Sequence, residues 1–222
     1  MDAKYVLQPE DFIDDAERLG CSVAAVRAVA SVETRGSGFC PDGFPKTLFE
    51  GHYFHKLTKG RYSKDYPTIS YPKWTRQFYG KTWQAERERL ALACSLDKPA
   101  ALMSASWGTF QIMGANFAMC GYATVQQFVN AMCKDANTHL AAFTEYIIEA
   151  GLVDELQECR WADFARIYNG PGQVPTYATR LEEAYNTYAA LDLPPESAQD
   201  ENYPTEVDVQ AAIDEDLTPV NS

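Results

Sequence analysis

Residues 22–33 read Ser-Val-Ala-Ala-Val-Arg-Ala-Val-Ala-Ser-Val-Glu and are followed by Thr-Arg-Gly-Ser-Gly-Phe at 34–39. Val26, Ala30 and Glu33 are spaced by four and three residues, so they share one face of a predicted helix. A carboxylate on an apolar face is costly to desolvate, and desolvation favours its protonated form. A carboxyl group that keeps its proton near neutral pH can act as a general acid. The spacing fits an ordinary glutamate at a solvent-exposed helix end equally well.

Helical spacing of apolar residues continues through most of the chain. Pro9 and Gly20 bound the first predicted helix, and Ser22 is a suitable N-cap for the second. Residues 36–46 are rich in Gly, Pro and Asp, which is typical of a small hairpin or irregular loop, and the aromatic run 47–55 fits either strand or helix. Further helices are predicted at 83–95, 98–104, 106–117, 124–134, 137–150, 161–168 and 176–191. The pattern predicts a mainly α fold.

The segment 56–83 differs from the rest because its periodicity is weak and basic residues alternate with aromatic ones. The basic residues are Lys56, Lys59, Arg61, Lys64, Lys73, Arg76 and Lys81. The aromatic residues are Tyr62, Tyr66, Tyr71, Trp74, Phe78, Tyr79 and Trp83. A long segment of this composition is typical of a functional loop.

The net charge of −12 is concentrated at the C-terminal end of the sequence. Residues 192–222 contain nine acidic residues and no Lys or Arg, which leaves 22 acidic and 19 basic residues elsewhere. This proline-containing stretch is expected to be a disordered or loosely attached tail, with a short helix near 207–216. One folded domain is therefore expected over residues 1–191. The overall acidity argues against nucleic-acid binding.

Other sequence features exclude several classes of protein. The start of the chain has neither the basic nor the apolar region of a signal peptide, and no stretch is long and apolar enough to span a membrane. His52 and His55 have the spacing of helical metal ligands but lack an acidic partner, so neither a metal nor a cofactor is expected. A monomer is expected because no heptad seam is present. The cysteines are expected to be reduced and mostly buried, although pairing in space stays open; they are residues 21, 40, 94, 120, 133 and 159.

A second motif is Ser-Ala-Ser-Trp-Gly-Thr-Phe-Gln-Ile-Met at 104–113. Ser106 is predicted to cap a helix, and Gly108 would let another backbone or a ligand approach closely. Gln111 is a polar side chain set between Phe110 and Ile112. On its own, this motif is weak evidence of a site.

A third motif is Ala-Arg-Ile-Tyr-Asn-Gly-Pro-Gly at 165–172. Asn169 and Gly170 are expected to end a helix that Pro171 cannot continue. The hydroxyl of Tyr168 would then lie at the helix end, available to a cleft. Asn-Gly is a common helix stop, so this motif is also weak when taken alone.

Together and in this order, the three motifs resemble the lysozyme-like superfamily, which includes goose-type lysozymes and lytic transglycosylases. The closest resemblance is to the phage-type N-acetylmuramidase domain of endolysins. It covers about residues 9–190 and leaves the acidic tail outside. It implies an α+β lysozyme-like fold in which a helical lobe joins a small hairpin or irregular lobe that carries a long basic-aromatic insertion. The matching stretches are Val32–Phe39, Pro41–Gly43, Leu48–His52, Ala105–Gly114 and Tyr168–Gly172.

The resemblance implies cleavage of the β-1,4 bond between N-acetylmuramic acid and N-acetylglucosamine in peptidoglycan. By position, Glu33 corresponds to the family's general acid. Glycoside hydrolysis usually needs a second carboxylate, and Glu50 matches the family's acidic residue in the Leu-Phe-Glu segment. Asp42 is the runner-up, although Asp-Gly after Pro is typical of a turn. Alternatively, Glu50 is a structural acid paired with His52 or an arginine.

The resemblance also assigns substrate-binding roles, which fall on His52, Ser106, Gln111, Tyr168 and Asn169. These side chains are expected to line the cleft, bind N-acetyl groups or fix Glu33, and His52 is expected to orient Glu50. The insertion's aromatics would stack on sugars and its cations would meet envelope anions, or the aromatics would simply complete the core. The sequence departs from the family at Gly51, where a larger and often basic residue is expected, and at Pro175.

Three functions remain open from the sequence. The first is an endolysin made in the cytoplasm of an infected bacterium, which acts on glycan strands of the wall after the membrane is permeabilised. The second is a lytic transglycosylase, which needs one essential carboxyl group, Glu33, and forms an anhydro-sugar without adding water. The third is a non-catalytic peptidoglycan-binding or virion protein. Dependence of activity on Glu50 would favour the hydrolase over the transglycosylase.

Overall fold

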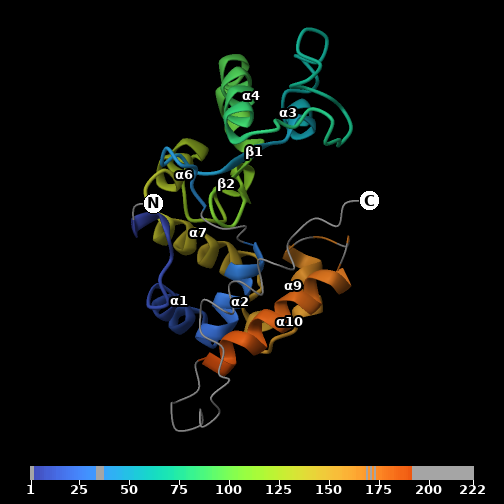
Figure 1. Ribbon diagram of the computed structural model, residues 1–222. Helices are drawn as coiled ribbons and strands as arrows, with labels where there is room; N and C mark the ends of the chain where they lie inside the picture. Colours follow the sequence, from blue (N-terminus) through green and yellow to red (C-terminus); the bar gives the residue numbers. More distant parts are fainter. Residues whose placement is uncertain (1–2, 34–37, 169, 171, 173, 192–222) are drawn as a thin grey trace. The chain divides into compact units, whose positions relative to one another are not determined.

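The computed structural model describes residues 3–33, 38–168, 170, 172 and 174–191 (Figure 1). The chain divides into two compact units. The sheet unit comprises Met1–Leu7 and Ser37–Glu149, and the helical unit comprises Gln8–Gly36 and Ala150–Ser222. The acidic tail, with its predicted helix near 207–216, lies outside the described residues.

The helical unit is built around α2. Its helices are α1 (Asp11–Leu19), α2 (Val23–Glu33), α8 (Val153–Gln157), α9 (Trp161–Tyr168) and α10 (Val174–Leu191). Helix α10 packs along both α2 and α9, and α1 packs on the other side of α2 (Figure 1). Every residue from 24 to 32 is buried, including Arg27, whose guanidinium lies over the Tyr188 ring. The small Ala and Val side chains allow neighbours on several sides, as expected of a helix that is apolar nearly all round.

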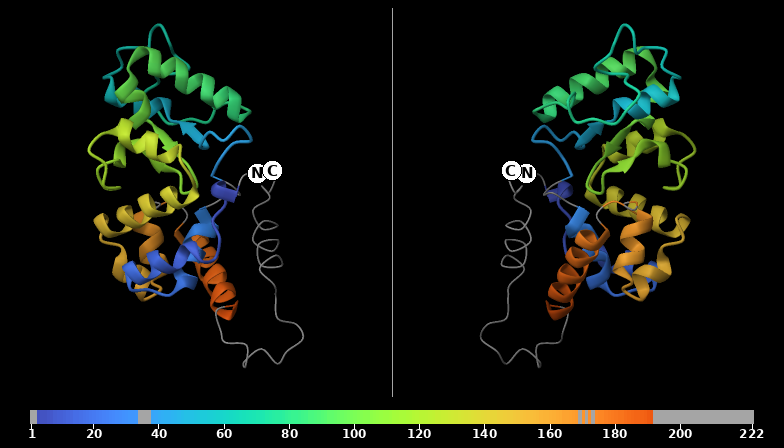
Figure 2. Two further views of the ribbon diagram at one scale, coloured as in Figure 1. Left: turned by 90° about the vertical axis from the view of Figure 1, so that its left-hand side faces the viewer. Right: turned by 90° about the vertical axis from the view of Figure 1, so that its right-hand side faces the viewer.

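The sheet unit contains a three-stranded antiparallel sheet in the order β1-β2-β3. Strand β1 (Thr47–Phe49) pairs with β2 (Ala105–Trp107), and β2 pairs with β3 (Ile112–Met113). The aromatic run 47–55, for which the sequence allowed either strand or helix, contains both β1 and most of α3. Helix α4 lies against β1 (Figure 2). The helices of this unit are α3 (Gly51–Leu57), α4 (Trp83–Leu96), α5 (Lys98–Met103), α6 (Val125–Met132) and α7 (Ala136–Glu149), with short 3-10 helices at Ala3–Tyr5 and Gly114–Asn116.

The helix predicted over 106–117 is wrong. The segment forms most of β2, a tight turn, β3 and a 3-10 helix. Gly108 and Gln111 have φ angles of 70° and 47°, a left-handed conformation that no α-helix interior contains. Ser106 is therefore not a helix cap: it lies in β2, and its hydroxyl donates to the Gln111 Oε1 at 2.8 Å. The described part of the turn-rich segment, 38–46, is a small hairpin as predicted, closed by a bridge between Phe39 and Pro45.

The turn after β2 is held against α7 by a buried histidine. A Cβ added at Gly108 would lie 2.7 Å from the ring of His139, which is 1% exposed. The His139 Nδ1 accepts the Thr109 N–H at 3.1 Å, so the ring proton is assigned to Nε2, which donates to the Met132 carbonyl at 2.7 Å. The ring also stacks on Phe39 at 4.6 Å. Position 108 is therefore a glycine because the His139 side chain approaches it closely, and not because another backbone or a ligand does.

The six cysteines are all free thiols. Cys40 and Cys120 are buried, three others are half-buried, and Cys133 is exposed. The expectation that the cysteines are mostly buried is thus wrong, since only two of the six are buried and Cys133, which follows the last turn of α6, is exposed. Among the described residues, no helix is long and apolar enough to cross a membrane.

Gly108→Ala is expected to destabilise the sheet unit by roughly 2–5 kcal/mol, because it adds a collision with His139 to the strain of a positive φ. Urea unfolding followed by tryptophan fluorescence measures this change. Gly121→Ala is the control, since Gly121 has a φ of 79° but would meet only the Glu145 Cγ, at 3.8 Å. Its cost should be about 1–2 kcal/mol. Equal costs for the two variants would contradict the packing assigned to His139.

Burial lowers the pKa of His139 below its ordinary value of 6.5. Between the lowered pKa and about pH 6.5, His139 is protonated in the unfolded chain but neutral in the folded unit. The stabilisation from the neutral, buried ring is therefore fully present above about pH 6.5. It is lost as the pH falls through the lowered pKa. We expect urea midpoints of the parent to decrease from pH 8 to pH 5, and His139→Gln to reduce that slope while lowering stability at pH 8. An unchanged slope in the variant would contradict the assignment.

Candidate active site

Glu50 occupies the junction between β1 and α3. Its backbone N–H donates to the Ser104 carbonyl at 2.8 Å, which extends the pairing of β1 by one residue. Its carbonyl accepts the N–H groups of Tyr53 and Phe54 at 2.9 and 3.0 Å, which begins α3. Although Glu50 stands at the N-cap position, its side chain accepts no N–H group of the helix. The carboxylate is therefore oriented by other groups.

Two side chains hold the carboxylate of Glu50, whose side chain is 15% exposed. The Tyr79 hydroxyl donates to Oε1 at 2.7 Å, and the His52 Nδ1 lies 3.1 Å from Oε2. This second contact lacks the alignment of a hydrogen bond, and neither of its two buried atoms has another partner among the described residues. Burial raises the pKa of Tyr79, and the hydrogen bond and charge of Glu50 raise it further. The Tyr79 hydroxyl thus stays protonated and remains a donor.

Gly51 is small because the insertion packs against it. A Cβ at this position would lie 2.4 Å from Cε1 of the Tyr71 ring and 2.5 Å from the Ile69 carbonyl oxygen. Tyr71 is buried and packs at a tilt on Phe78, at 5.0 Å between centroids. Burial raises the pKa of the Tyr71 hydroxyl. The aromatic ring of the insertion therefore occupies the space of the larger side chain that the family resemblance led us to expect.

A buried ion pair on α4 lies beneath this cluster. Glu86 is 5% exposed, and its carboxylate accepts two hydrogen bonds from the Arg89 Nη1, at 2.8 and 3.0 Å. Glu86 also accepts the N–H groups of Phe49, at 3.1 Å, and of Gly80. Arg89 in turn donates to the Thr68 carbonyl at 3.3 Å. One ion pair therefore joins α4, the end of β1 and two points of the insertion.

Asp42 is engaged elsewhere. Its two oxygens accept hydrogen bonds from Nη1 and Nη2 of Arg87 at 2.5 and 3.1 Å, and this pairing lowers the pKa of Asp42. The Oδ1 atom also accepts the Phe44 N–H at 3.2 Å, as in an Asx turn. The Arg87 guanidinium lies over the rings of Phe44 and Trp83. Asp42 thus has the contacts of a turn residue tied to α4.

The predicted binding residues Ser106 and Gln111 are brought together. The Gln111 Oε1 accepts the Ser106 hydroxyl, and its Nε2 donates to the Gly108 carbonyl at 2.8 Å. The amide therefore braces the turn between β2 and β3 from within. Gln111 is nevertheless exposed, so the edge of its side chain faces solvent.

The helical unit carries the remaining predicted residues. Glu33 is the last residue of α2, and its side chain lies outside the described part. Tyr168 is the last residue of α9, where its half-buried ring stacks on Phe164 at 5.4 Å. Asn169 is not among the described residues.

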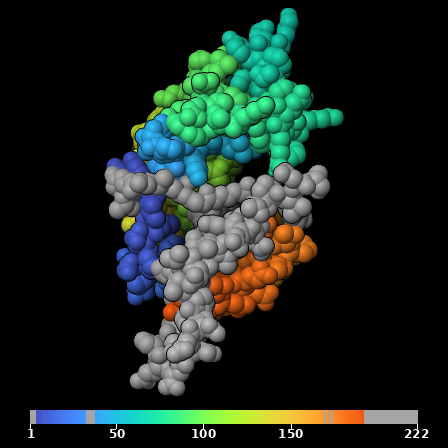
Figure 3. All heavy atoms as spheres, in the orientation of Figure 1, coloured from blue at the N-terminus to red at the C-terminus, as the bar shows by residue number. Residues whose placement is uncertain are grey.

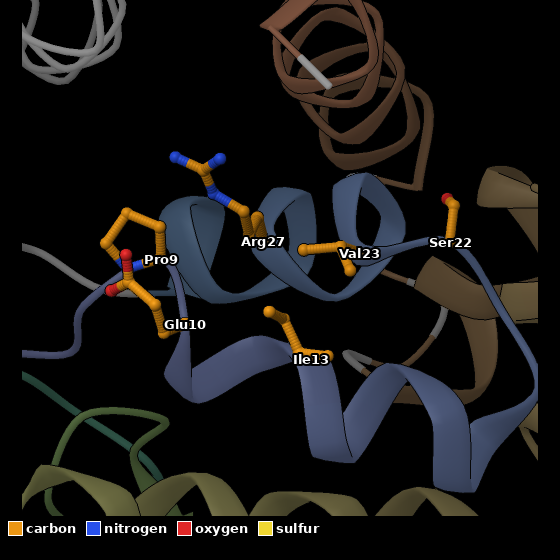
Figure 4. A pocket seen from close by; sticks show the side chains of 6 residues that line it. All are labelled: Pro9, Glu10, Ile13, Ser22, Val23 and Arg27. Carbon is orange, nitrogen blue, oxygen red and sulfur yellow. The ribbon is translucent and has the colours of Figure 1, made fainter. Parts of the chain in front are cut away.

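A hollow of about 380 Å³ lies between α1 and α2 (Figure 4). None of the predicted site residues lines it. Its walls are mainly apolar, with one acidic and one basic side chain, and consist of Pro9, Glu10, Ile13, Ser22, Val23 and Arg27.

The insertion divides its aromatic residues between core and surface. The Tyr62 hydroxyl donates to the Leu96 carbonyl at 2.7 Å, and its ring stacks on Phe54. Trp74, in contrast, is 58% exposed, and the Arg76 guanidinium lies 5.6 Å from its ring centroid. The segment projects at the surface of the sheet unit (Figure 3). The expectation that aromatics of the insertion complete the core is thus confirmed for Tyr62, whereas stacking of the exposed Trp74 on sugars stays a prediction. Sequence reasoning did not single out Tyr71 or Tyr79, for which its only signal was the aromatic composition.

Comparisons with known proteins identify the class. The N-acetylmuramidase family model matches residues 22–189. The crystal structure of the Burkholderia AP3 phage endolysin superposes with a TM-score of 0.78 at 35% identity, over 85% of this chain and 73% of that one. A search of curated proteins gives no match. The chain is therefore a glycoside hydrolase of the lysozyme-like type. It belongs to the N-acetylmuramidase family.

Glu86→Gln is expected to destabilise the sheet unit by about 3 kcal/mol, because it leaves the buried Arg89 without its counter-charge. Activity should fall as well, since the Phe49 and Gly80 N–H groups lose a charged acceptor. Thermal unfolding and turnover of a glycan substrate measure the two effects. Asp42→Asn is the matched control: it makes the same chemical change in an exposed pair with Arg87, which should matter little. If both variants lost equal stability, the anchoring role of Glu86 would be refuted.

Proposed function

We propose that this chain is an endolysin that hydrolyses the β-1,4 bond between N-acetylmuramic acid and N-acetylglucosamine in peptidoglycan. Family membership and the likeness to a phage endolysin support this function. The observation that carries it is the half-buried Glu50 carboxylate, which has one oxygen held by Tyr79 and the other without an aligned partner.

Glu33 is the proposed general acid, which protonates the leaving glycosidic oxygen. It ends an 11-residue helix whose preceding turns are buried. The negative end of a helix dipole disfavours a carboxylate and favours a protonated carboxyl group at that position. A protonated carboxyl group is what the first step of glycoside hydrolysis requires.

Glu50 is the proposed second carboxylate. It either activates a water molecule or attacks the anomeric carbon, according to whether the enzyme inverts or retains configuration. The Tyr79 hydroxyl donates to Oε1 and holds the carboxylate in place. His52 orients Glu50 in this proposal, while Ser106, Gln111, Tyr168 and Asn169 bind the N-acetyl groups of the glycan.

The remaining features of the proposal concern organisation and place of action. Residues 1–191 act as the catalytic domain, and residues 192–222 form a separate acidic tail. The protein works as a monomer on glycan strands, without a cofactor. It is made in the cytoplasm of the bacterial host and reaches the wall once the membrane is permeabilised.

A second candidate is a lytic transglycosylase in which Glu33 acts alone. It is favoured by the contacts of Glu50 with His52 and Tyr79, since a purely structural acid would be held in the same way. In that case Glu50 would be dispensable for bond cleavage.

Digestion of purified peptidoglycan by the parent, Glu33→Gln and Glu50→Gln, followed by mass spectrometry of the sugar ends, separates the two candidates. We expect reducing N-acetylmuramic acid ends from the parent and a loss of at least about 100-fold in both variants. Anhydro-muramic ends, together with an active Glu50→Gln, would establish the transglycosylase instead.

A further inference from the structure

The insertion residue closest to the proposed chemistry is Tyr79. Its hydroxyl is the one side-chain donor aligned with the Glu50 carboxylate among the described residues. The two residues are 29 positions apart in sequence. Tyr79 belongs to the segment 56–83, which none of the family-like motifs includes.

We propose that Tyr79 is a positioning residue, which fixes the orientation of the Glu50 carboxylate. This inference rests on the proposed function of Glu50 as the second carboxylate. It assigns the insertion a part in catalysis through Tyr79, in addition to any contact that its exposed face makes with the wall.

The position of Tyr79 is fixed independently of Glu50. Its backbone N–H donates to the Arg76 carbonyl at 3.1 Å, and the next residue, Gly80, donates to the buried Glu86. A Cβ at Gly80 would lie 2.6 Å from the Glu86 N atom, so the segment runs directly over the start of α4. The Arg89 guanidinium covers the Tyr79 ring at 5.9 Å. Because the backbone and ring of Tyr79 are already fixed, its hydroxyl can hold the Glu50 carboxylate in one orientation without a further entropic cost at the moment of reaction.

The groups near the Glu50 carboxylate come from two elements, with His52 on α3 and Tyr71 and Tyr79 in the insertion. The Glu86–Arg89 pair of α4 lies against the neighbouring Phe49 and against the Tyr79 ring. The charge of Arg89 is largely compensated by Glu86, which it contacts through two hydrogen bonds. His52 touches the other oxygen without hydrogen-bond alignment. The Tyr79 hydroxyl is consequently the aligned donor whose removal changes the carboxylate most directly.

The test compares Tyr79→Phe with Tyr62→Phe on soluble peptidoglycan fragments. Both changes remove one hydroxyl from a half-buried tyrosine of the same insertion, and both break a hydrogen bond of 2.7 Å. Tyr62, however, donates to the Leu96 carbonyl, away from Glu50. Tyr79→Phe is expected to lower kcat by about 10–100-fold with KM changed less than about two-fold, because a misplaced reacting group costs rate more than binding. Tyr62→Phe should retain the parent kcat.

Thermal unfolding of the two variants separates positioning from a merely structural role. Each variant loses one hydrogen bond of the same length, so the two unfolding midpoints should fall by similar amounts while only Tyr79→Phe loses kcat. Replacing Tyr79 by 3-fluorotyrosine keeps the hydroxyl donor and should retain the parent kcat. It provides the test if Tyr79→Phe folds poorly, and a loss of kcat in that variant would contradict the proposal.

The outcomes separate this inference from the proposed function. A parent-like kcat in Tyr79→Phe, with Glu50→Gln inactive, would overturn the positioning role and leave the hydrolase intact. An equal loss in Tyr62→Phe would also overturn it, since the effect would then come from the fold of the insertion. Full activity of Glu50→Gln would instead remove the proposed function on which the inference rests.

Discussion

The buried pair of Glu86 and Arg89 is the interaction on which the surroundings of Glu50 depend. An ion pair removed from water is tolerated only when hydrogen bonds satisfy both charges. Here the acceptors and donors that complete it are backbone groups of β1 and of the insertion. The hydrogen bonds that satisfy the charge of Glu86 therefore also anchor the segment that carries Tyr79. A surface pair, such as Asp42 with Arg87, imposes no comparable demand on its surroundings.

The surroundings of Glu50 depend on that anchoring, because Glu86 binds the backbone of Phe49, next to Glu50, and of Gly80, next to Tyr79. Glu50 is the residue at which β1 ends and α3 begins, so its backbone is fixed on both sides. Its side chain has no role in capping the helix and is left for Tyr79 and His52. Gln111 differs from Glu50, because both polar atoms of its side-chain amide form hydrogen bonds around its own turn, with Ser106 and Gly108. One carboxylate oxygen of Glu50 therefore keeps an unaligned neighbour, whereas both polar atoms of the Gln111 amide are hydrogen-bonded.

Much of the helical frame was predictable; α2, for example, is a long apolar run preceded by Ser22, whose hydroxyl accepts the Ala25 N–H as expected of an N-cap. The segment 106–117 was not, since its apolar residues fit helical spacing as well as strand spacing. Only the left-handed conformations of Gly108 and Gln111, together with the buried ring of His139, decide for the hairpin. Local sequence does not contain that tertiary constraint.

The candidate site was predictable only as far as its motifs extend. Glu50 and His52 stand in a recognisable stretch, and their proximity is confirmed. Tyr79 and Tyr71 were visible merely as members of an aromatic segment, because nothing local distinguishes a tyrosine that meets a carboxylate from one that fills a core. Gly51 shows the same limit. From the sequence it is an unexplained departure from the family pattern, and only the position of the Tyr71 ring beside it in the fold explains it.

The side-chain contacts of Glu50 come from one stretch of the chain, and this has an evolutionary consequence. Glu50, the His52 and Tyr79 side chains at its carboxylate, and the Glu86–Arg89 pair that anchors the insertion all lie between residues 50 and 89. A single contiguous stretch of gene could therefore be exchanged between relatives, carrying the carboxylate and its side-chain partners together. Recombination within the stretch would separate Glu50 from the side chains that contact it.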